Sequence, residues 1–386
     1  MKRQRPVYRI PKLNVIPIAR KEFRQIRRDR RALGLLLLIP AMMLVMFGYA
    51  LNFDVKHSAL GVYDEDNTKT SRDFANLFFN SEYFDHTYQL HDSREMDDLL
   101  DDGTVLGVVV VPTDFSENIT SGSEAPVQIV VDGANANTAT TVLGYINAII
   151  QQYSSNVMAK TFSRLGGQEI QMPIDLRPRI WYNPELRSAK FLVPGLIAFI
   201  LTIAAVVSTS LAVVREWEMG TVEQIIVSPA KPVELILGKT IPYTIIALIS
   251  TVTILLAGYV LFDVAIKGSF LWLFIVTFVF LVGSLGLGLL ISTVAGTQQV
   301  AFMIAVIATM LPTFILSGFV FPIRNMPPII QAVTYLIPAR YFLVALRSII
   351  LKGVGPSAFW DQFLLLSAFA TLTLAASSIR LRKLLQ

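Results

Sequence analysis

Residues 270–294 read FLWLFIVTFVFLVGSLGLGLLISTV, and none of these side chains carries a charge. A helix of roughly 20 apolar residues spans a bilayer whose hydrocarbon core is about 30 Å thick. The segment is therefore predicted to be a transmembrane helix. Four further segments satisfy the same criterion, and a fifth does so with one charge, Asp361, near its start. These five predicted spans are Ala32–Leu51, Phe191–Val214, Ile241–Phe262, Val300–Phe321 and Ala358–Ile379.

The composition of the whole chain agrees with six membrane spans. Of its 386 residues, 53% are hydrophobic and 16% are charged, and the mean hydropathy is +0.56. Soluble globular proteins are about 45–50% apolar and about 25% charged. The composition therefore argues against a cytosolic enzyme, a disordered protein and a nucleic-acid-binding protein. The chain has no cysteine, which excludes a disulfide framework, a thiolate metal site and a cysteine nucleophile.

The charges divide the chain into two kinds of region. Residues 52–188 contain 20 of the 28 acidic residues but only 9 of the 33 basic ones, whereas the first 31 residues contain twelve Lys and Arg. Cytoplasmic flanks of membrane spans are rich in Lys and Arg. Both termini are therefore predicted to be cytoplasmic, with residues 52–190 outside the cytoplasm. The basic start also fits a signal peptide, but the long apolar run without a cleavage pattern favours a signal anchor.

The N-terminal segment, residues 1–31, has a helical pattern ahead of the first span, residues 32–51. Four arginines follow one helical stripe, and four apolar residues lie on the neighbouring face. We predict a cytoplasmic amphipathic helix on an anionic leaflet, the alternative being a basic anchor without a folded helix. The arginines are Arg20, Arg24, Arg27 and Arg31, and the apolar residues are Ile16, Ala19, Phe23 and Ile26.

The acidic segment 52–190 is long enough to form its own core. Four stretches rich in β-branched and aromatic residues predict strands, and helical stretches lie between them, so an α/β domain is expected. Its histidines have no repeated ligand spacing, so no metal site is predicted. The predicted strands are Ser58–Tyr63, Tyr83–Leu90, Val105–Val111 and Val127–Val131, and the predicted helices are Ser71–Asn80, Ser93–Leu100 and Asn135–Phe162.

A further apolar stretch, Ile329–Ile350, is interrupted by Pro338, Arg340 and Arg347. An arginine at the centre of a span costs at least about 2.5–3.5 kcal/mol. We therefore predict a broken or re-entrant element at the external face. The two arginines would lie on one helix face and be anchored by carboxylates such as Asp361 or acids of the external domain, the alternative being direct contact with a substrate.

The loop after the second span contains REWEMGTVEQII at residues 215–226. Apolar side chains share one helical face, whereas Glu216, Gly220 and Glu223 share another. The pattern predicts a short amphipathic helix that presents glutamates to the cytosol, or alternatively a plain connection between two spans.

No catalytic or nucleotide-binding motif is present in the sequence. Gly238-Lys239-Thr240 matches the end of a phosphate-binding loop, but Val233 stands where that motif needs its first glycine. No set of catalytic side chains or metal ligands converges, so the chain is not expected to be an enzyme.

Several motifs together resemble those of bacterial ABC-transporter permeases of the second export type, in particular the drug-efflux branch with a large periplasmic insertion. The resemblance covers essentially the whole chain. The motifs are REWEMGTVEQ at 215–224, LGKTIPY at 237–243, LSGFVFP at 316–322, MPP at 326–328 and YLIPARYF at 335–342.

The resemblance implies a multispan α-helical half-transporter of the bacterial inner membrane. Two such chains, identical or paralogous, would pair among the membrane lipids. Each would bind a cytosolic ATPase subunit that holds ATP and Mg²⁺, so no cofactor is expected on this chain. The C-terminal region, residues 191–386, would hold spans two to six. A periplasmic adaptor is a further partner that the resemblance leaves open.

The resemblance also implies roles for two sets of residues. The helix at 215–226 would be the coupling helix that docks into the ATPase, and the segment 326–350 would form re-entrant helices at the exit. The coupling residues are Arg215, Glu216, Trp217, Glu218, Gly220, Thr221 and Glu223, and the exit residues are Gly318, Pro322, Pro338, Arg340, Tyr341 and Arg347.

The resulting hypothesis is an ATP-driven exporter of hydrophobic or amphiphilic compounds, such as drug- or antibiotic-like molecules or lipids. The alternative is a membrane-anchored sensor or binding protein that uses the external α/β domain. Six spans exceed what a sensor needs, which favours the exporter.

Overall fold

The computed structural model describes residues 15–51, 59–81, 83–84, 86–164, 181–183, 187–220 and 232–384. The chain forms two compact units. The membrane unit comprises Met1–Asn52 and Ile180–Gln386, and the α/β unit comprises Phe53–Arg179.

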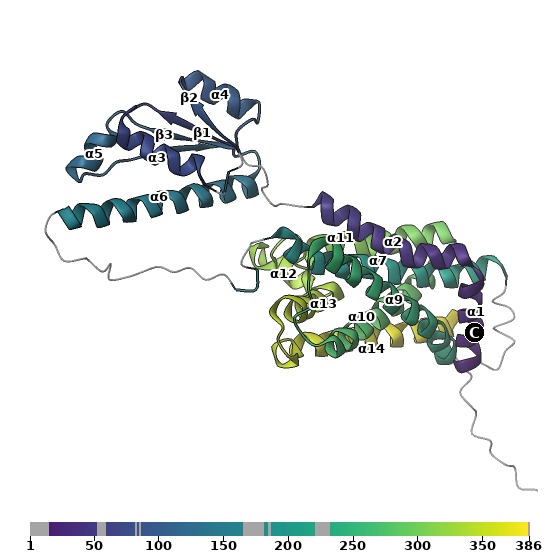
Figure 1. Cartoon of the computed structure of the whole chain (residues 1–386). Coiled ribbons are helices and arrows are strands. Elements are labelled where there is room, and N and C mark those ends of the chain that lie inside the picture. Colours follow the sequence, from purple (N-terminus) through teal and green to yellow (C-terminus); the bar gives the residue numbers. More distant parts are fainter. Residues whose placement is uncertain are drawn as a thin grey trace, which may run out of the picture. The chain divides into compact units, whose positions relative to one another are not determined.

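The α/β unit is built on a four-stranded sheet with the order β2-β1-β3-β4 (Figure 1). β1 pairs in parallel with both β2 and β3, whereas β4 runs antiparallel to β3. All four strands lie within the predicted ranges or differ from them by one residue, so the predicted strands are confirmed. The strands are β1 Ala59–Asp64, β2 His86–Leu90, β3 Gly107–Val111 and β4 Gln128–Val131.

Helices cover both faces of this sheet, which explains why every residue of β3 is buried. Val109 and Val111 pack with Phe74 of α3 and with α6, while Val108 and Val110 pack on the opposite face with Leu99 of α4. The three predicted helices are confirmed, and the structure adds α5, which was not predicted. The helices are α3 Lys69–Phe79, α4 Ser93–Asp101, α5 Phe115–Ser121 and α6 Ala136–Arg164. The location of this unit outside the cytoplasm stays a prediction.

The membrane unit is a bundle of long helices. Within the described residues, five of them are long and apolar enough to cross a membrane, and α2 adds a shorter apolar stretch, Leu36–Ala50. The apolar windows of α7 and α10 are 72% and 61% buried, against 22–33% in the other three, so α7 and α10 form the centre of the bundle. The helices are α2 Arg30–Ala50, α7 Ser188–Glu218, α9 Pro232–Phe262, α10 Phe270–Ser292, α11 Gln298–Leu316 and α14 Trp360–Leu384.

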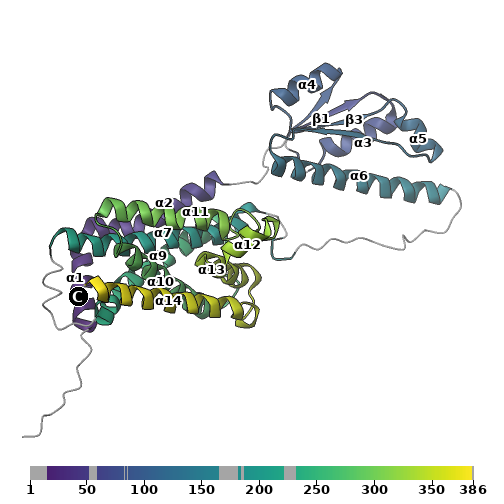
Figure 2. The ribbon, with the colours of Figure 1, turned by 180° about the vertical axis from the view of Figure 1, so that it is seen from behind.

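The uncharged segment 270–294 forms α10, and its glycines let neighbouring helices approach closely. A Cβ added at Gly288 would lie 2.5 Å from the carbonyl oxygen of Val206 in α7, closer than real Cβ contacts. Hydroxyl groups on the neighbouring helices bind α10 carbonyl groups: Thr209 Oγ1 donates to Leu285 O at 3.3 Å, and Ser377 Oγ of α14 donates to Gly286 O at 2.8 Å. Small residues and interhelical hydrogen bonds of this kind hold membrane helices together. Figure 2 shows α14 beside α10 from behind.

The predicted break in the segment 326–350 is confirmed. Helix α12 (Pro328–Thr334) is followed by α13 (Pro338–Arg347), whose helical path continues to Lys352. The chain bends by 83° between α12 and α13. A proline begins each helix, where its missing N–H costs no hydrogen bond. The bent pair would be a sixth span if it crosses the membrane as one element.

The predicted amphipathic helix of the N-terminal segment is also present, as α1 (Val15–Arg28). Its apolar residues divide, however, between two environments. Ile26 is buried against the membrane unit, whereas Ile16 and Phe23 are exposed. Part of the predicted apolar face therefore packs within the membrane unit, and the contact of α1 with an anionic leaflet stays a prediction.

Candidate functional site

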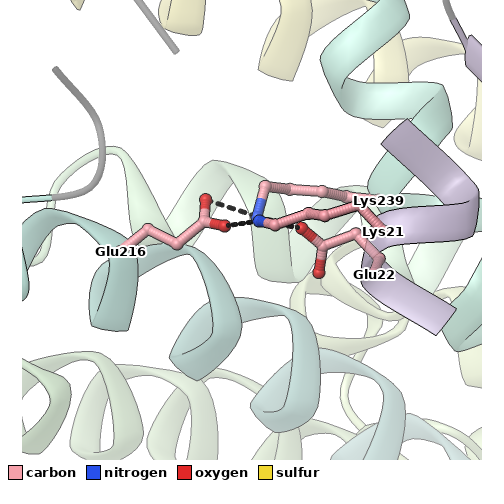
Figure 3. A network of polar contacts seen from close by, with 4 residues as sticks. All are labelled: Lys21, Glu22, Glu216 and Lys239. Atoms are coloured by element: carbon pink, nitrogen blue, oxygen red, sulfur yellow. Dashed lines mark hydrogen bonds and ion pairs between the residues drawn. The ribbon is translucent and has the colours of Figure 1, made fainter. Parts of the chain in front are cut away.

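Four charged side chains form a cluster at the end of the membrane unit where α7 stops and α9 begins. Glu216 of α7 binds two lysines: its Oε2 lies 2.6 Å from Lys239 Nζ and its Oε1 lies 2.7 Å from Lys21 Nζ. Glu22 Oε1 lies 2.9 Å from Lys21 Nζ and 3.4 Å from Lys239 Nζ. Figure 3 shows the four side chains converging from α1, α7 and α9. Hereafter, the charge cluster means Lys21, Glu22, Glu216 and Lys239.

The charge cluster is buried but electrically balanced. Glu22, Glu216 and Lys239 expose only 3%, 5% and 7% of their surface. A buried charge is strongly unfavourable unless it is paired. Here each carboxylate contacts both ammonium groups, so the two positive and two negative charges compensate one another.

Lys21 is the exposed member of the charge cluster. Partial burial by itself lowers the pKa of Lys21, but the hydrogen bonds to Glu216 and Glu22 raise it, and the net result is a pKa above the ordinary value. Lys21 therefore remains protonated under all physiological conditions.

The triplet Gly238-Lys239-Thr240 has a structural role in this site. A Cβ added at Gly238 would lie 2.5 Å from Cγ2 of Ile18, so α1 contacts the backbone of α9 at this glycine. The close approach brings Lys239, the next residue, within reach of Glu22. The motif that resembles a phosphate-binding loop thus serves the contact between two helices.

The last turn of α7 makes contacts with two further parts of the bundle. Glu218 accepts a hydrogen bond of 2.8 Å from the backbone N–H of Gln298, and the Gln298 side chain also donates to it. This carboxylate therefore caps the N-terminus of α11, where a negative charge is stabilising. Arg215 Nη1 lies 3.9 Å from Asp29 Oδ2, in the link between α1 and α2.

The predicted coupling helix needs two corrections. Arg215 to Glu218 belong to the last turn of α7, so no separate helix begins at 215. Glu216 is buried in the charge cluster and does not face the cytosol, because the lysines of α1 and α9 attract it inward. Trp217 and Met219 expose 37% and 53% of their surface, and Gly220 turns the chain with φ +69°. Thr221, Glu223 and the rest of 221–226 lie outside the described residues.

The sequence interpretation missed three of the four residues of the charge cluster, namely Lys21, Glu22 and Lys239. A signal was present, because an ionisable residue at the start of an apolar helix needs a partner. Lys239 stands directly before the predicted span 241–262.

The two arginines of α13 lie toward the other end of α7. Arg347 donates to Gly318 O at 3.1 Å and to Phe319 O at 3.3 Å, just after α11 ends, and its guanidinium lies 4.0 Å from the ring centre of Phe191 near the start of α7. A cation is favourable at a helix C-terminus because the terminal carbonyl groups lack intrahelical partners. Arg347 therefore joins the end of α11 to the beginning of α7.

Arg340 of α13 contacts the C-terminal end of α12 across the bend. It donates to the hydroxyl group of Thr334 and stacks 3.8 Å above the ring centre of Tyr335. Tyr341 donates from its hydroxyl group to Tyr335 O at 2.6 Å, which adds a second contact across the bend.

The predicted pairing of Arg340 and Arg347 with Asp361 is wrong. Among the described residues of the membrane unit, no carboxylate lies within ion-pair distance of either arginine. The alternative, pairing with acids of the α/β unit, stays a prediction. The backbone carbonyl groups that follow α11 and the aromatic rings take that role. The other predicted exit residues mark turns nearby: Gly318 has φ +81°, Pro322 precedes a short 3-10 helix, and Pro338 begins α13.

Comparison with known proteins agrees with this architecture. The chain is 36% identical over 365 residues to the probable multidrug ABC transporter permease YbhS of Escherichia coli, an alignment that covers 94% of this chain and 95% of that protein. It is 32% identical over 369 residues to the probable multidrug ABC transporter permease YbhR, covering 95% and 98%. The chain also matches ABC transporter G family member 20 of Dictyostelium discoideum at 24% identity, and spans 47% of that protein.

The profile of the ABC-2 family of transporter proteins matches residues 32–379, which include the α/β unit and all or most of every membrane-crossing candidate. Members of this family are membrane transport subunits, with ATPase activity in a separate subunit. The chain therefore belongs to the ABC-2 family of transporter permeases and is a membrane-embedded transport subunit, not an enzyme.

Proposed function

We propose that this chain is the permease of an exporter that moves hydrophobic or amphiphilic compounds out of the cytoplasm or the inner leaflet of a bacterial inner membrane. Drug- or antibiotic-like molecules and lipids are the substrate classes. ATP hydrolysis on a separate cytosolic ATPase subunit supplies the energy. The observation that carries this proposal is the near full-length similarity to two probable multidrug permeases.

Two permease chains, identical or paralogous, pair in this proposal, and each binds one ATPase. The docking surface begins at the exposed side chains Trp217 and Met219 and continues into the segment that holds Thr221 and Glu223. Glu216 is not part of this surface, since its carboxylate is engaged by two lysines. Both termini face the cytoplasm, and the α/β unit lies outside.

The role of Arg340 and Arg347 in the proposal is to hold the external end of the bundle in shape. Arg347 fixes the turn after α11, and Arg340 fixes the bend between α12 and α13. The exit then opens and closes around a rigid bent element.

The experiment that tests the proposal uses inverted membrane vesicles containing the permease and its ABC ATPase subunit. ATP-dependent uptake of ethidium and of a fluorescent phospholipid is measured. The matched control uses the same permease with an ATPase variant in which the lysine of the phosphate-binding loop is replaced. Uptake of either probe that requires both the permease and active ATPase is expected. A permease that purifies without any ATPase and supports no ATP-dependent uptake would contradict the proposal and favour the sensor alternative.

The docking surface has its own test. Met219→Asp changes an exposed side chain, so folding is expected to be unchanged while ATPase binding weakens. Co-purification of the ATPase is the measurement, with Arg24→Gln on the exposed face of α1 as the control. Unchanged co-purification would remove Met219 from the docking surface.

A further inference from the structure

The α/β unit contains a cavity of about 1050 Å³ between α5, the loop that follows α5 and the second half of α6. Figure 1 shows α6 passing below α5. Small-molecule sites in proteins usually have volumes of about 300–1,000 Å³. All described residues that line the cavity belong to the α/β unit, so it is a different site from the charge cluster and from the bent pair α12 and α13. The cavity is large enough for a drug-sized ligand.

Aromatic rings form the floor of this cavity. Phe74 of α3 and Phe115 of α5 expose only 1% and 2% of their surface, and their ring centres lie 5.1 Å apart. Tyr153 of α6 contacts both, with its ring centre 4.9 Å from that of Phe74 and 6.4 Å from that of Phe115. The three rings belong to the core of the unit, so the floor is formed before any ligand binds. A ligand that covers it gains free energy because apolar surface is removed from water.

The rim of the cavity is acidic. Asp114 lies directly before α5 and Glu124 lies in the loop after it, and both side chains are exposed. Asn118 Nδ2 donates a hydrogen bond of 2.8 Å to Asp114 Oδ2, which orients that carboxylate. Among the described residues that line the cavity, none is basic. The rim therefore presents two negative charges above an apolar floor.

The acidic rim and the aromatic floor both favour a positively charged ligand. Carboxylates attract a cation directly, and the faces of Tyr and Phe rings attract it through their quadrupole. An anionic amphiphile would be repelled by Asp114 and Glu124, and a neutral one would gain nothing from their charges. The surrounding sequence acts in the same direction, because residues 52–188 contain 20 acidic and 9 basic residues.

We infer that this cavity is a binding site for amphiphilic organic cations. The apolar body of the ligand covers the aromatic floor, and its charge lies beside Asp114 and Glu124. Binding at this site needs neither ATP nor transport, so the inference goes beyond the proposed function and can hold even if that function fails. It gives the α/β unit a role of its own in recognising a class of compounds.

The test measures binding of radiolabelled tetraphenylphosphonium to the complete chain in lipid nanodiscs by equilibrium dialysis. No ATPase and no ATP are present, and empty nanodiscs give the background that the lipid contributes. Tetraphenylborate is the matched control ligand, because it has the same shape and nearly the same size but the opposite charge.

Two variants change the cavity at exposed positions, so both are expected to fold. Asp114→Asn/Glu124→Gln removes the two charges and keeps the size of the side chains. Ser154→Arg places a long cationic side chain at the cavity from α6. The matched control, Asp97→Asn/Asp101→Asn, removes two charges from exposed positions of α4, which packs on the opposite face of the sheet.

The natural chain and the control variant are expected to bind tetraphenylphosphonium saturably, and to bind tetraphenylborate more weakly. The affinity of Asp114→Asn/Glu124→Gln for tetraphenylphosphonium is expected to fall about three- to thirty-fold, as the loss of two exposed ion pairs implies. In Ser154→Arg, the saturable binding is expected to be lost.

Three results would overturn the inference. The first is a natural chain that binds no tetraphenylphosphonium above the lipid background. The second is saturable binding that both cavity variants retain with the affinity of the control, which would place the ligand elsewhere on the chain. The third is saturable binding of tetraphenylborate as tight as that of tetraphenylphosphonium, which would show that the carboxylates of the rim do not select for a cation.

Discussion

The two ends of the membrane unit bury cations in different ways. At the end of α7, the lysines pair with carboxylates that come from other helices, and the four charges compensate one another. Near the start of α7, Arg347 and Arg340 bind backbone carbonyl groups, a hydroxyl group and aromatic rings. The first arrangement fixes several helices relative to one another. The second fixes the bend between α12 and α13 and joins the turn after α11 to the start of α7.

The largest effect is expected from removing one member of the buried charge pair. Lys239→Met leaves Glu216 and Glu22 with only Lys21 as a counter-charge, and Glu216→Gln leaves an excess of positive charge. Breaking a buried pair costs about 3–5 kcal/mol. Each single variant is expected to lose assembled protein in detergent, measured by size-exclusion chromatography after a heating series.

The double variant Glu216→Gln/Lys239→Met sharpens this result. Because it restores the balance of charge, its thermal stability is expected to exceed that of both single variants. Equal losses in all three variants would mean that the individual hydrogen bonds matter more than the balance.

An intermediate effect is expected at Arg347. Arg347→Met removes a charged donor from two carbonyl groups, and hydrogen bonds to charged groups contribute about 1.5–3 kcal/mol. Arg347→Lys is expected to recover only part of the loss, since an ammonium group lacks the planar fork that reaches two carbonyl oxygens. The measurement is the thermal midpoint in detergent, and a lysine variant equal to the natural protein would contradict the capping role.

A smaller effect is expected at Arg340. Arg340→Ala removes one cation–π contact of about 1 kcal/mol and one hydrogen bond at the bend. Both assembly and export are expected to fall together, measured as protein yield and as ATP-dependent uptake of two chemically different dyes. If the ratio of the two dyes changes while assembly is intact, Arg340 contacts the substrate instead.

The smallest effect is expected at Lys21, whose side chain is 55% exposed and therefore screened by water. Lys21→Met also leaves Glu22 and Glu216 with a single lysine, but the Lys21 position is open to solvent, so water can replace the ammonium group there and the cost is expected to be about 1 kcal/mol or less. Because the folded-state pKa of Lys21 is raised above its ordinary value of 10.5, its contribution is fully present below that pH and is lost as the pH rises through the folded pKa. The difference in thermal midpoint between Lys21→Met and the natural chain should be constant from about pH 6 to 10 and shrink only when the pH exceeds the ordinary value of 10.5. A difference that already shrinks at neutral pH would contradict the raised pKa.

The sequence predicted the elements whose signal is local. The strand β3 reads GVVVV and is buried on both faces, as its continuous apolar run indicates. The break at Pro338 followed from one proline and two arginines, Arg340 and Arg347, within an apolar stretch. The uncharged run 270–294 predicted α10, and its glycines meet neighbouring helices.

The candidate site was only partly predicted. The motif at 215–224 directed attention to the end of α7, but periodicity alone placed Glu216 on an exposed face. Its partners Lys21 and Lys239 are not neighbours in any periodic pattern, and the contact to Lys21 spans 195 positions of the sequence.

The sequence by itself therefore determined the apolar helices, the strands and helices of the α/β unit, and the bend, because each of these depends on residues within one or two dozen positions of one another. It also determined the family, because each family motif is a short run of residues. Only the tertiary structure decided which charges meet. Glu22 and Lys239 are 217 positions apart and pair because α1 packs against α9 at Gly238. Arg347 binds carbonyl groups instead of a carboxylate because the end of α11 lies beside it. A buried charge takes whichever partner the packing of helices brings within about 4 Å, and helix packing is a property of the whole bundle.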